Sequence, residues 1–413
     1  LDLFADVQAS NDAIARFAGL AEAKNFERFC AKARSVYDTL QAPYIQSPSP
    51  SVVQIMKALG PRGLGVLASL GAMSSLWDSL GRYFKDQRMR QLFARYATYC
   101  GSSPWLAPAT LMLIAQVEMD GVWSIEGGMH ALPRCLERMA KERGVTFMYG
   151  QPCKSIDTQG GKVSGVSLGE GGYLPADAVV FNGDVSALHA GLLGADVAKP
   201  TAQANRERSL SAITWSMVAK TNGMPLERHN VFFQNTYADE FEAIFNRKAL
   251  PDKPTVYVCA QDRGIDAPVP EEGERLLCLV NAPAVGDQDV LTHEAIEQCQ
   301  HNSFQLLQQC GLQLHSTPSQ IQRTTPIEFN RLFAGTGGAL YGQATHGWMA
   351  AFARPNAKSL IPGLFLAGGS VHPGPGVPMA AMSGRLAGAA VMAHLASTKR
   401  STLAVTSGGM SMH

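Results

Sequence analysis

Apolar residues recur at steps of three and four along residues 10–42, a spacing that predicts an amphipathic helix. Phe26, Phe29, Val36 and Leu40 share one face of this helix, while the neighbouring charged side chains fall elsewhere. The helix therefore has one face to bury against the rest of the protein.

A second apolar stretch, residues 52–77, follows a proline-rich break at residues 43–50. Lys57 and Arg62 lie within it, and their charges exclude a helix that spans a full bilayer. Two interpretations remain open for this stretch: a pair of interfacial helices at a membrane surface, or a pair of core helices under a substrate cap.

Another helix is predicted to open at Asp86, with Arg90 four residues further on. Side chains at this spacing share a helix face, so the two are expected to pair. Phe93 and Tyr96 follow on nearby faces. The pair is either a solvated surface bridge or lies buried near a ligand.

From Gly121 onward the pattern changes to α/β. Residues 122–125 resemble a strand, Glu126-Gly127-Gly128 a turn, and residues 132–139 one face of a helix. Short apolar runs separated by glycine turns then predict a helix that feeds a strand and a small antiparallel meander. The strand runs are residues 146–149, 154–156, 163–168 and 178–181.

Residues 195–355 are predicted to form a separate unit. It ends in a glycine-rich loop that carries Tyr341, His346 and Trp348. Beyond Ser397 the chain shows no apolar period, which predicts a disordered tail. The expected strands of the unit are residues 213–219, 231–234, 255–260 and 276–281, and its helix is residues 293–310.

Near the C-terminus an apolar run, residues 364–367, meets Gly368-Gly369, a Pro/Gly loop and a small-residue helix predicted from Met379. Such a junction brings backbone N–H groups and the positive end of a helix to one point, which suits an anionic cofactor group. No acidic residue occupies the first turns of this helix, so its dipole stays available. The alternative is a plain turn between a core strand and a packed helix.

Composition narrows the classes of function. The 413 residues include 35 basic and 34 acidic ones, a net charge of +1 that excludes an electrostatic surface for nucleic acid. Charged residues make up only 17%, against about a quarter in ordinary globular proteins. This deficit fits a protein that handles an apolar ligand or rests on a membrane.

Cysteine and histidine spacing argues against a metal site. The eight cysteines form no CxxC pair and the ten histidines no HExxH motif. We expect the cysteines to be reduced and structural, in an intracellular protein without a signal peptide.

Two segments carry a family resemblance: VWSIEGGMHALPRCLERMAKERGVTFMYGQPCKSI and GLFLAGGSVHPGPGVPMAAMSGRLAG. They are similar to flavin-binding stretches of the carotenoid (phytoene-type) desaturase family of FAD flavoproteins, whose His-Pro-Gly-x-Gly-x-Pro core the second contains. RHNVFFQNTYADEFEAIF, PTVYVCAQDRG and YATYCGSSP resemble the 1-hydroxycarotenoid 3,4-desaturase branch (methoxyneurosporene or hydroxyneurosporene desaturases). The similarity covers essentially residues 1–396.

The resemblance implies an α/β fold of two domains, like that of the amine oxidases and phytoene desaturases. It also implies a glycine-rich dinucleotide unit that is not found in this chain, so we expect roughly a hundred residues before Leu1. The expected parts are a helical cap or substrate region (1–118), part of the FAD domain (119–194), a substrate domain of mixed sheet (195–355), the rest of the FAD domain (356–396) and a tail (397–413).

The implied reaction removes two hydrogens from a long apolar carotenoid, with FAD as hydride acceptor. By the same resemblance, two clusters of residues are expected to bind the cofactor. The first is Gly127, Gly128, Cys153 and Asp184, and the second is Gly368, Gly369, His372, Pro378, Met379 and Ala380.

Asp86 and Arg90 match the family's D-x-x-x-R-Q segment and are the candidate acid/base residues. His229 and Asn230 are predicted to receive a hydroxyl end group. Tyr341, His346 and Trp348 either line the substrate tunnel or simply pack there.

Several alternatives stay open. Relatives of this fold isomerise or saturate polyenes or oxidise amines, and a fragment without catalysis, which only binds lipid, belongs to another class. The family implies a cytoplasmic protein at the surface of the inner or photosynthetic membrane. The electron acceptor that reoxidises the flavin is unknown.

Overall fold

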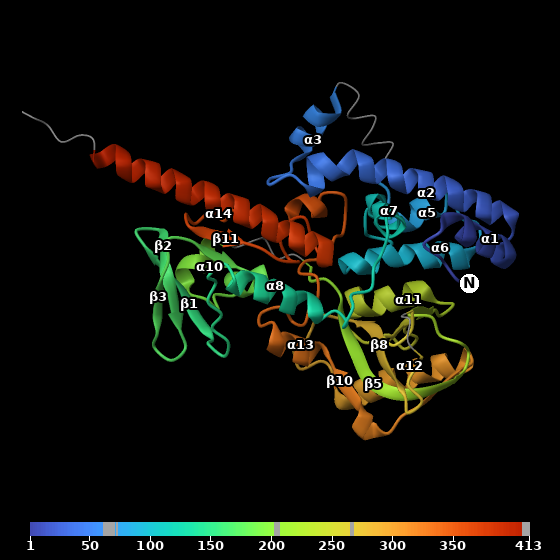
Figure 1. Ribbon diagram of the computed structural model, residues 1–413. Coiled ribbons are helices and arrows are strands. Elements are labelled where there is room, and N and C mark those ends of the chain that lie inside the picture. The colour runs from blue at the N-terminus through green and yellow to red at the C-terminus, as the bar shows by residue number, and fades with distance from the viewer. Residues whose placement is uncertain (61–70, 72, 202–206, 265–267, 407–413) are drawn as a thin grey trace, which may run out of the picture.

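The computed structural model describes residues 1–60, 71, 73–201, 207–264 and 268–406. Figure 1 shows three regions: a helical region at the N-terminal side, a sheet covered by α12, and a mixed region from which the long α14 extends. Among the described residues, no helix combines the length and the apolar character needed to cross a membrane.

The helical region begins with two helices where the sequence predicts one. Gly19 has φ +96° and separates α1 (Val7–Ala18) from α2 (Leu20–Leu40), a backbone angle that glycine adopts at little cost. The prediction of one continuous helix over residues 10–42 is therefore wrong. A π-helical turn, η1 (Gln41–Ile45), ends α2.

The remaining helices of this region are short. Of the predicted pair at residues 52–77, only α3 (Val52–Leu59) and α5 (Leu76–Leu80) are described, because residues 61–70 and 72 lie outside the described part. The chain continues through α6 (Gln87–Ala94), η3 (Arg95–Cys100), η4 (Ala109–Met112) and α7 (Leu113–Met119).

Aromatic rings fill the core of the helical region. Phe29 is fully buried, and its ring centroid lies 4.8 Å from that of Phe93 and 5.5 Å from that of Phe84. Phe26 stacks on Phe93 at 5.7 Å. The apolar face that the sequence places on this helix is thus the face that α2 buries.

The mixed region contains two small sheets. Strands β1 (Cys153–Gln159), β2 (Lys162–Leu168) and β3 (Tyr173–Pro175) form the predicted antiparallel meander. Strand β4 (Val179–Phe181) leaves the meander and pairs in parallel with β11 (Leu364–Leu366). The helices here are α8 (Ala131–Lys141), α9 (Val185–His189), α10 (Ala195–Thr201) and α14 (Val377–Thr406).

Three predictions fail in the mixed region. Residues 122–125 and 146–149 are irregular, and Trp123 and Tyr149 are largely exposed, because no described strand lies beside them to complete a ladder. α14 continues as helix to Thr406, so the predicted tail from Ser397 is wrong over that stretch. Residues 407–413 lie outside the described part.

The third region is built on one sheet with the strand order β10-β5-β8-β7-β6. β9 also pairs with β5, and Trp215 on β5 is fully buried under α12, where its indole donates to Gln300 Oε1 at 2.8 Å. The strands are β5 (Ser211–Gly223), β6 (His229–Phe232), β7 (Val256–Ala260), β8 (Glu274–Ala282), β9 (Leu312–His315) and β10 (Ile321–Thr324). The helices are α11 (Tyr237–Phe241), η5 (Glu242–Arg247), α12 (His293–Gln309), η6 (Pro318–Gln320), α13 (Pro326–Leu332) and η7 (Ala350–Ala353).

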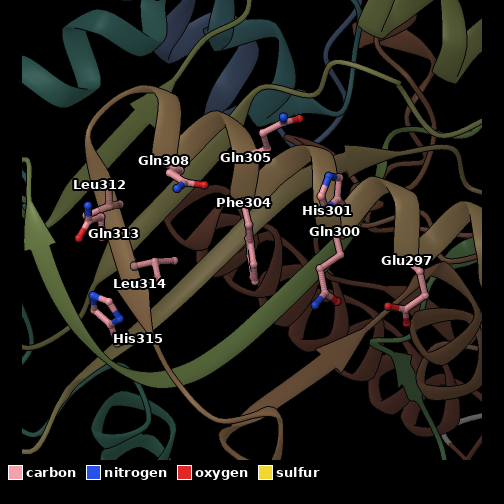
Figure 2. Close-up of a pocket in the computed structure, with 10 residues that line it drawn as sticks. All are labelled: Glu297, Gln300, His301, Phe304, Gln305, Gln308, Leu312, Gln313, Leu314 and His315. Atoms are coloured by element: carbon pink, nitrogen blue, oxygen red, sulfur yellow. The ribbon is translucent and has the colours of Figure 1, made fainter.

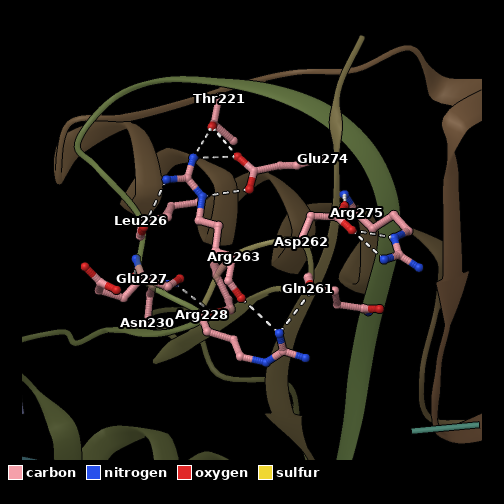
Figure 3. A network of polar contacts seen from close by, with 11 residues as sticks. Thr221, Leu226, Glu227, Arg228, Asn230, Gln261, Asp262, Arg263, Glu274 and Arg275 are labelled. Atoms are coloured by element: carbon pink, nitrogen blue, oxygen red, sulfur yellow. Dashed lines mark hydrogen bonds and ion pairs between the residues drawn. The ribbon is translucent and has the colours of Figure 1, made fainter. Parts of the chain in front are cut away.

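An ion-pair network joins the ends of these strands (Figure 3). The buried carboxylate of Glu274 pairs with Arg263 at 2.7 Å and accepts from the Thr221 hydroxyl at 2.6 Å. Burial alone would raise the pKa of Glu274, but the hydrogen bonds from Arg263 and Thr221 hold it below its usual value.

Loss of the Arg263 guanidinium would leave Glu274 buried and unpaired. We expect Arg263→Met to lower the free energy of unfolding by about 3 kcal/mol in urea titrations. Adding Glu274→Leu should recover most of that loss, because no uncompensated charge then remains buried. The exposed pair Arg323–Glu297 is the matched control, and Arg323→Met should cost less than about 1 kcal/mol. An equal cost at both sites would contradict the prediction.

Candidate functional site

The junction between β11 and α14 is held tightly against the end of β4. The Ala367 N–H donates to Phe181 O at 3.0 Å, and the Asn182 side-chain amide donates to Ala367 O at 3.1 Å. Gly368 follows with φ +117°, and a Cβ there would lie 3.0 Å from Asn182 Nδ2. Glycine is required at this position by both the backbone angle and the close approach.

The loop after Gly369 is anchored on both sides. The Ser370 hydroxyl accepts the Val185 N–H at 3.3 Å, and the His372 N–H donates to Pro355 O at 2.8 Å. The peptide bond between His372 and Pro373 is cis. The loop therefore connects the start of α9 with the segment before β11.

His372 is buried and neutral in character. Its Nε2 lies 3.1 Å from Ser47 O, to which it donates, and its ring meets Tyr44 edge-on at 5.1 Å. Its pKa is lowered from 6.5 to about 4, mainly by burial and to a smaller extent by the Arg354 guanidinium, and the backbone carbonyls of Ser47 and Tyr44 act in the opposite direction. Nδ1 is buried without a hydrogen bond to any described residue.

The first turn of α14 is open to ligands. Val377 and Pro378 are exposed, no acidic residue lies in this turn, and the Ala380 N–H closes the first helical bond on Gly376 O at 2.8 Å. One residue earlier, the backbone N–H of Met379 has no carbonyl within the helix to which it can donate. This end of α14 is suited to a negatively charged group.

These residues fit the flavin that the sequence resemblance implies. A Cβ at Gly376 would meet nothing within 4 Å, so its backbone faces open space, and one at Gly369 would make only an ordinary contact with Pro375 at 3.6 Å. The helix end supplies positive potential, and His372 Nδ1 is a buried polar atom without a protein partner. Gly368, Gly369 and the α14 start would hold the cofactor, which would supply hydride acceptance.

The other predicted cofactor residues divide into two groups. Asp184 follows β4 and caps α9, accepting the Ser186 N–H and hydroxyl at 2.8 and 2.7 Å, so the β4–β11 pairing brings it beside the junction. Gly127 and Gly128 form an exposed turn with positive φ before α8, a helix in which no residue is buried. Cys153 is exposed at the start of β1, and partial burial raises the pKa of its thiol.

Asp86 and Arg90 do not form the pair that their spacing predicts. Asp86 caps α6 and binds Arg88 at 2.7 Å, and these hydrogen bonds lower the pKa of its carboxyl. Arg90 instead donates to Trp77 O at 2.9 Å and stacks 4.0 Å from the Trp77 ring. The expected Asp86–Arg90 pair is wrong, because the cap position turns the carboxylate toward the backbone of the first turn.

The Trp77 ring belongs to an aromatic cluster that joins the helical region to α11. Its centroid lies 4.5 Å from that of Trp105, which lies 5.8 Å from Tyr237 and 5.7 Å from Phe241. Trp77 and Trp105 are half-buried, whereas the Tyr237 hydroxyl is buried without a hydrogen bond to a described residue. Sequence reasoning missed this cluster because its members come from three separate segments, two of them far from α11 in the chain.

His229 and Asn230 have different surroundings although they are neighbours on β6. The exposed His229 ring bonds the Tyr257 hydroxyl through Nδ1 at 2.7 Å. The Asn230 side-chain amide is buried and hydrogen-bonded within the protein. It donates to Glu227 O at 2.6 Å and accepts the Glu227 N–H at 2.9 Å. Of the two, His229 is the one placed to receive a ligand.

The three residues of the glycine-rich loop also differ. Tyr341 is half-buried and hydrogen-bonds through its backbone to Ser209 Oγ. His346 accepts the Ser103 N–H at Nε2 and lies 3.0 Å from Glu207 through Nδ1, so both ring nitrogens are used. Trp348 is 48% exposed and therefore free to contact a ligand.

Arg354 is a residue that sequence reasoning missed. Its side chain is buried, and Nη1 donates to Tyr341 O and Gly369 O at 3.0 and 3.2 Å, which ties the two loops together. A signal was present, because Arg354 is the one charged residue between Arg331 and Lys358. A lone charge in such a stretch indicates a residue with dedicated partners.

A separate hollow of about 620 Å³ lies between α12 and β9 (Figure 2). Its lining is mostly polar and includes Glu297, His301, Gln305 and His315. None of the predicted site residues lines it. Among the described residues, no three His, Cys, Asp or Glu side chains are grouped so as to hold a metal ion.

Comparisons with known proteins agree with the sequence resemblance. Residues 65–392 match the family profile of flavin containing amine oxidoreductases. The chain is 55% identical to a hydroxyneurosporene desaturase of Rubrivivax gelatinosus, covering 100% of this chain and 78% of that protein. It is 33% identical to a 1-hydroxycarotenoid 3,4-desaturase of a Flavobacterium, covering 77% and 64%. A solved putrescine oxidase variant has the same fold, with a TM-score of 0.53 at 11% identity over 90% of this chain and 76% of that one.

His372 should make stability depend on pH. The unfolded chain takes up a proton as pH falls below 6.5, whereas the folded chain resists until about 4, so stability is lost between these values. We expect His372→Gln to remove up to about 2 kcal/mol of the stability difference between pH 7.5 and pH 5, measured by urea unfolding. His301→Gln, an exposed control, should leave that difference unchanged, and an unchanged difference in His372→Gln would contradict the prediction.

Proposed function

The chain belongs to the flavin containing amine oxidoreductase family, and we propose that it is an FAD-dependent carotenoid desaturase that removes two hydrogens at C-3,4 of a 1-hydroxy or 1-methoxy carotenoid. The observation that carries this proposal is the 55% identity to a hydroxyneurosporene desaturase, because the similarity extends over the whole chain rather than over the flavin-binding segments alone. The family predicted from the sequence is confirmed.

Each half of the proposed site has a distinct task. FAD would supply a hydride acceptor when bound, and Gly368, Gly369 and the first turn of α14 would orient it by backbone contact. The positive end of α14 would stabilise negative charge on the flavin ring edge. Asp184, Gly127, Gly128 and Cys153 would contribute the rest of the cradle.

Loss of a hydride leaves positive charge on the substrate, so a proton must leave the neighbouring carbon to complete the double bond. We assign this proton to Asp86, whose carboxyl is ionised because the hydrogen bonds from Arg88 lower its pKa; the same hydrogen bonds weaken it as a base until they are released. Arg90, held against the Trp77 face, would position the helix that carries Asp86.

The aromatic cluster around Trp77 and Trp105 offers the apolar wall that a polyene needs. Trp348 is exposed and can extend this wall, while Tyr341 and His346 would shape it from the glycine-rich loop. His229 would receive the hydroxyl end group of the substrate, with Asn230 fixing the turn behind it.

A carotenoid is stored in membranes, so we also propose that the protein works at a membrane surface. α3 supports this proposal because Val53 on it is 63% exposed while Ile55 is buried. Flotation of the protein with phospholipid vesicles tests it, and a protein left entirely in the aqueous fraction would argue against it.

The reaction class is tested with the FAD-loaded protein and a 1-hydroxycarotenoid. We expect a product lighter by two hydrogens, with absorption moved to the red because conjugation lengthens. An isomerase would leave the mass unchanged, and a saturase would raise it. Either result would overturn the proposal.

Asp86→Asn should lower kcat by at least about 100-fold, because a neutral amide cannot accept the proton. Asparagine still caps α6, so thermal unfolding should change little. Asp6→Asn, which makes the same change at the cap of α1, is the control and should retain full activity. Retained activity in Asp86→Asn would exclude it as the base.

His229→Phe should reduce the preference for hydroxylated over plain carotenoids about fivefold, the value of one hydrogen bond. The measurement is the ratio of kcat/KM for the two substrates. His301→Phe on α12 is the control at an exposed histidine away from the sheet edge. An unchanged ratio in His229→Phe would remove this residue from the substrate site.

A further inference from the structure

Arg354 connects two separate loops near the candidate site. Nη1 donates to the carbonyls of Tyr341 and Gly369, and Nη2 donates to Gln343 O at 3.1 Å and Thr345 Oγ1 at 3.4 Å. A single planar guanidinium thus holds the glycine-rich loop and the β11–α14 junction in one arrangement.

Both loops pack against the guanidinium at van der Waals distance. A Cβ at Gly374 would lie 3.6 Å from Arg354 Nε, and one at Gly342 would lie 3.6 Å from Nη1. Both glycines have positive φ, +134° and +71°, so the two loops wrap closely around the side chain. Arg354 itself is only 5% exposed.

All four of these acceptors are neutral. Among the described residues, no carboxylate oxygen lies within 4.0 Å of the guanidinium, and Asp184 acts on it only from farther away. A buried cation without a counter-ion is costly, so its charge remains available to a ligand. The nearby His372 is kept neutral, so it adds no second positive charge.

We propose that Arg354 is a positioning residue that fixes the Gly369 loop for the flavin, and that its uncompensated positive charge favours electron uptake by the bound cofactor. The proposal rests on the FAD binding of the proposed function. Positive charge beside a ring that gains negative charge stabilises the reduced form and raises the reduction potential. The planar set of N–H donors on the guanidinium fixes the Gly369 loop, and the positive charge stabilises the reduced flavin.

The test uses the FAD-loaded protein and two readouts, the FAD dissociation constant from fluorescence quenching and the midpoint potential from spectroelectrochemical titration. Arg354→Met keeps the volume and removes the charge. It should weaken binding of reduced FAD relative to oxidised FAD about tenfold. This change lowers the midpoint potential of the bound cofactor by about 30 mV for a two-electron couple. Arg354→Lys keeps the charge but loses the fork, so its potential should stay near wild type while FAD binds about tenfold more weakly.

Arg263→Met is the matched control, since it removes another multiply bonded arginine from the sheet region. It should leave the potential unchanged even though it destabilises the fold. An unchanged potential in a folded Arg354→Met protein would overturn the electrostatic role. If Arg354→Met does not fold, Arg354→Lys decides. Unchanged FAD affinity in this variant would overturn the positioning role. A midpoint potential that falls although the charge is retained would overturn the electrostatic role. A wild-type protein that takes up no FAD would instead refute the proposed function.

Discussion

The candidate site depends on the parallel pairing of β4 with β11, because this ladder joins segments that lie about 185 residues apart in the chain. The pairing ends both strands at the same edge. Asn182 can then bridge to Ala367, and Ser370 can receive the Val185 N–H. α9 begins at Val185, shortly after β4 ends at Phe181, whereas α14 begins at Val377, beyond the loop that follows β11. The strand pair therefore fixes the start of α9 and the anchor of the loop that leads into α14.

The charged groups at this edge are mostly positive. The start of α14 carries no acidic side chain, Arg354 is buried without a counter-ion, and His372 is neutral. Asp184 is the carboxylate nearest in sequence to the edge, and the Ser186 N–H and hydroxyl already engage it. The local potential is therefore positive, which suits a pyrophosphate or the negative edge of a flavin.

The sequence predicted those elements whose signal is local. β5 and the apolar face of α2 each require only the chain near them. The predicted strand lies within β5 to within four residues at either end, and the predicted face is the one that α2 buries, although the helix begins at Leu20 rather than at residue 10. Residues 122–125 have a strand pattern but no strand beside them, and a pattern alone cannot supply a partner. Arg354 was missed for the related reason that its acceptors, such as Gly369, are known only once the loops have met.

The position of Asp86 restricts how it can act as a base. Its carboxylate receives the Arg88 N–H and guanidinium, and an acid held at a low pKa is a weak acceptor for a proton on carbon. The Arg88 side chain is exposed and rests on the Phe17 ring at 4.0 Å, so its guanidinium can move away without breaking a core. An apolar substrate that displaced it and covered Asp86 would raise the carboxyl pKa through desolvation. A polyene is a ligand of this kind, whereas a small polar amine would leave the ion pair in water and the base weak.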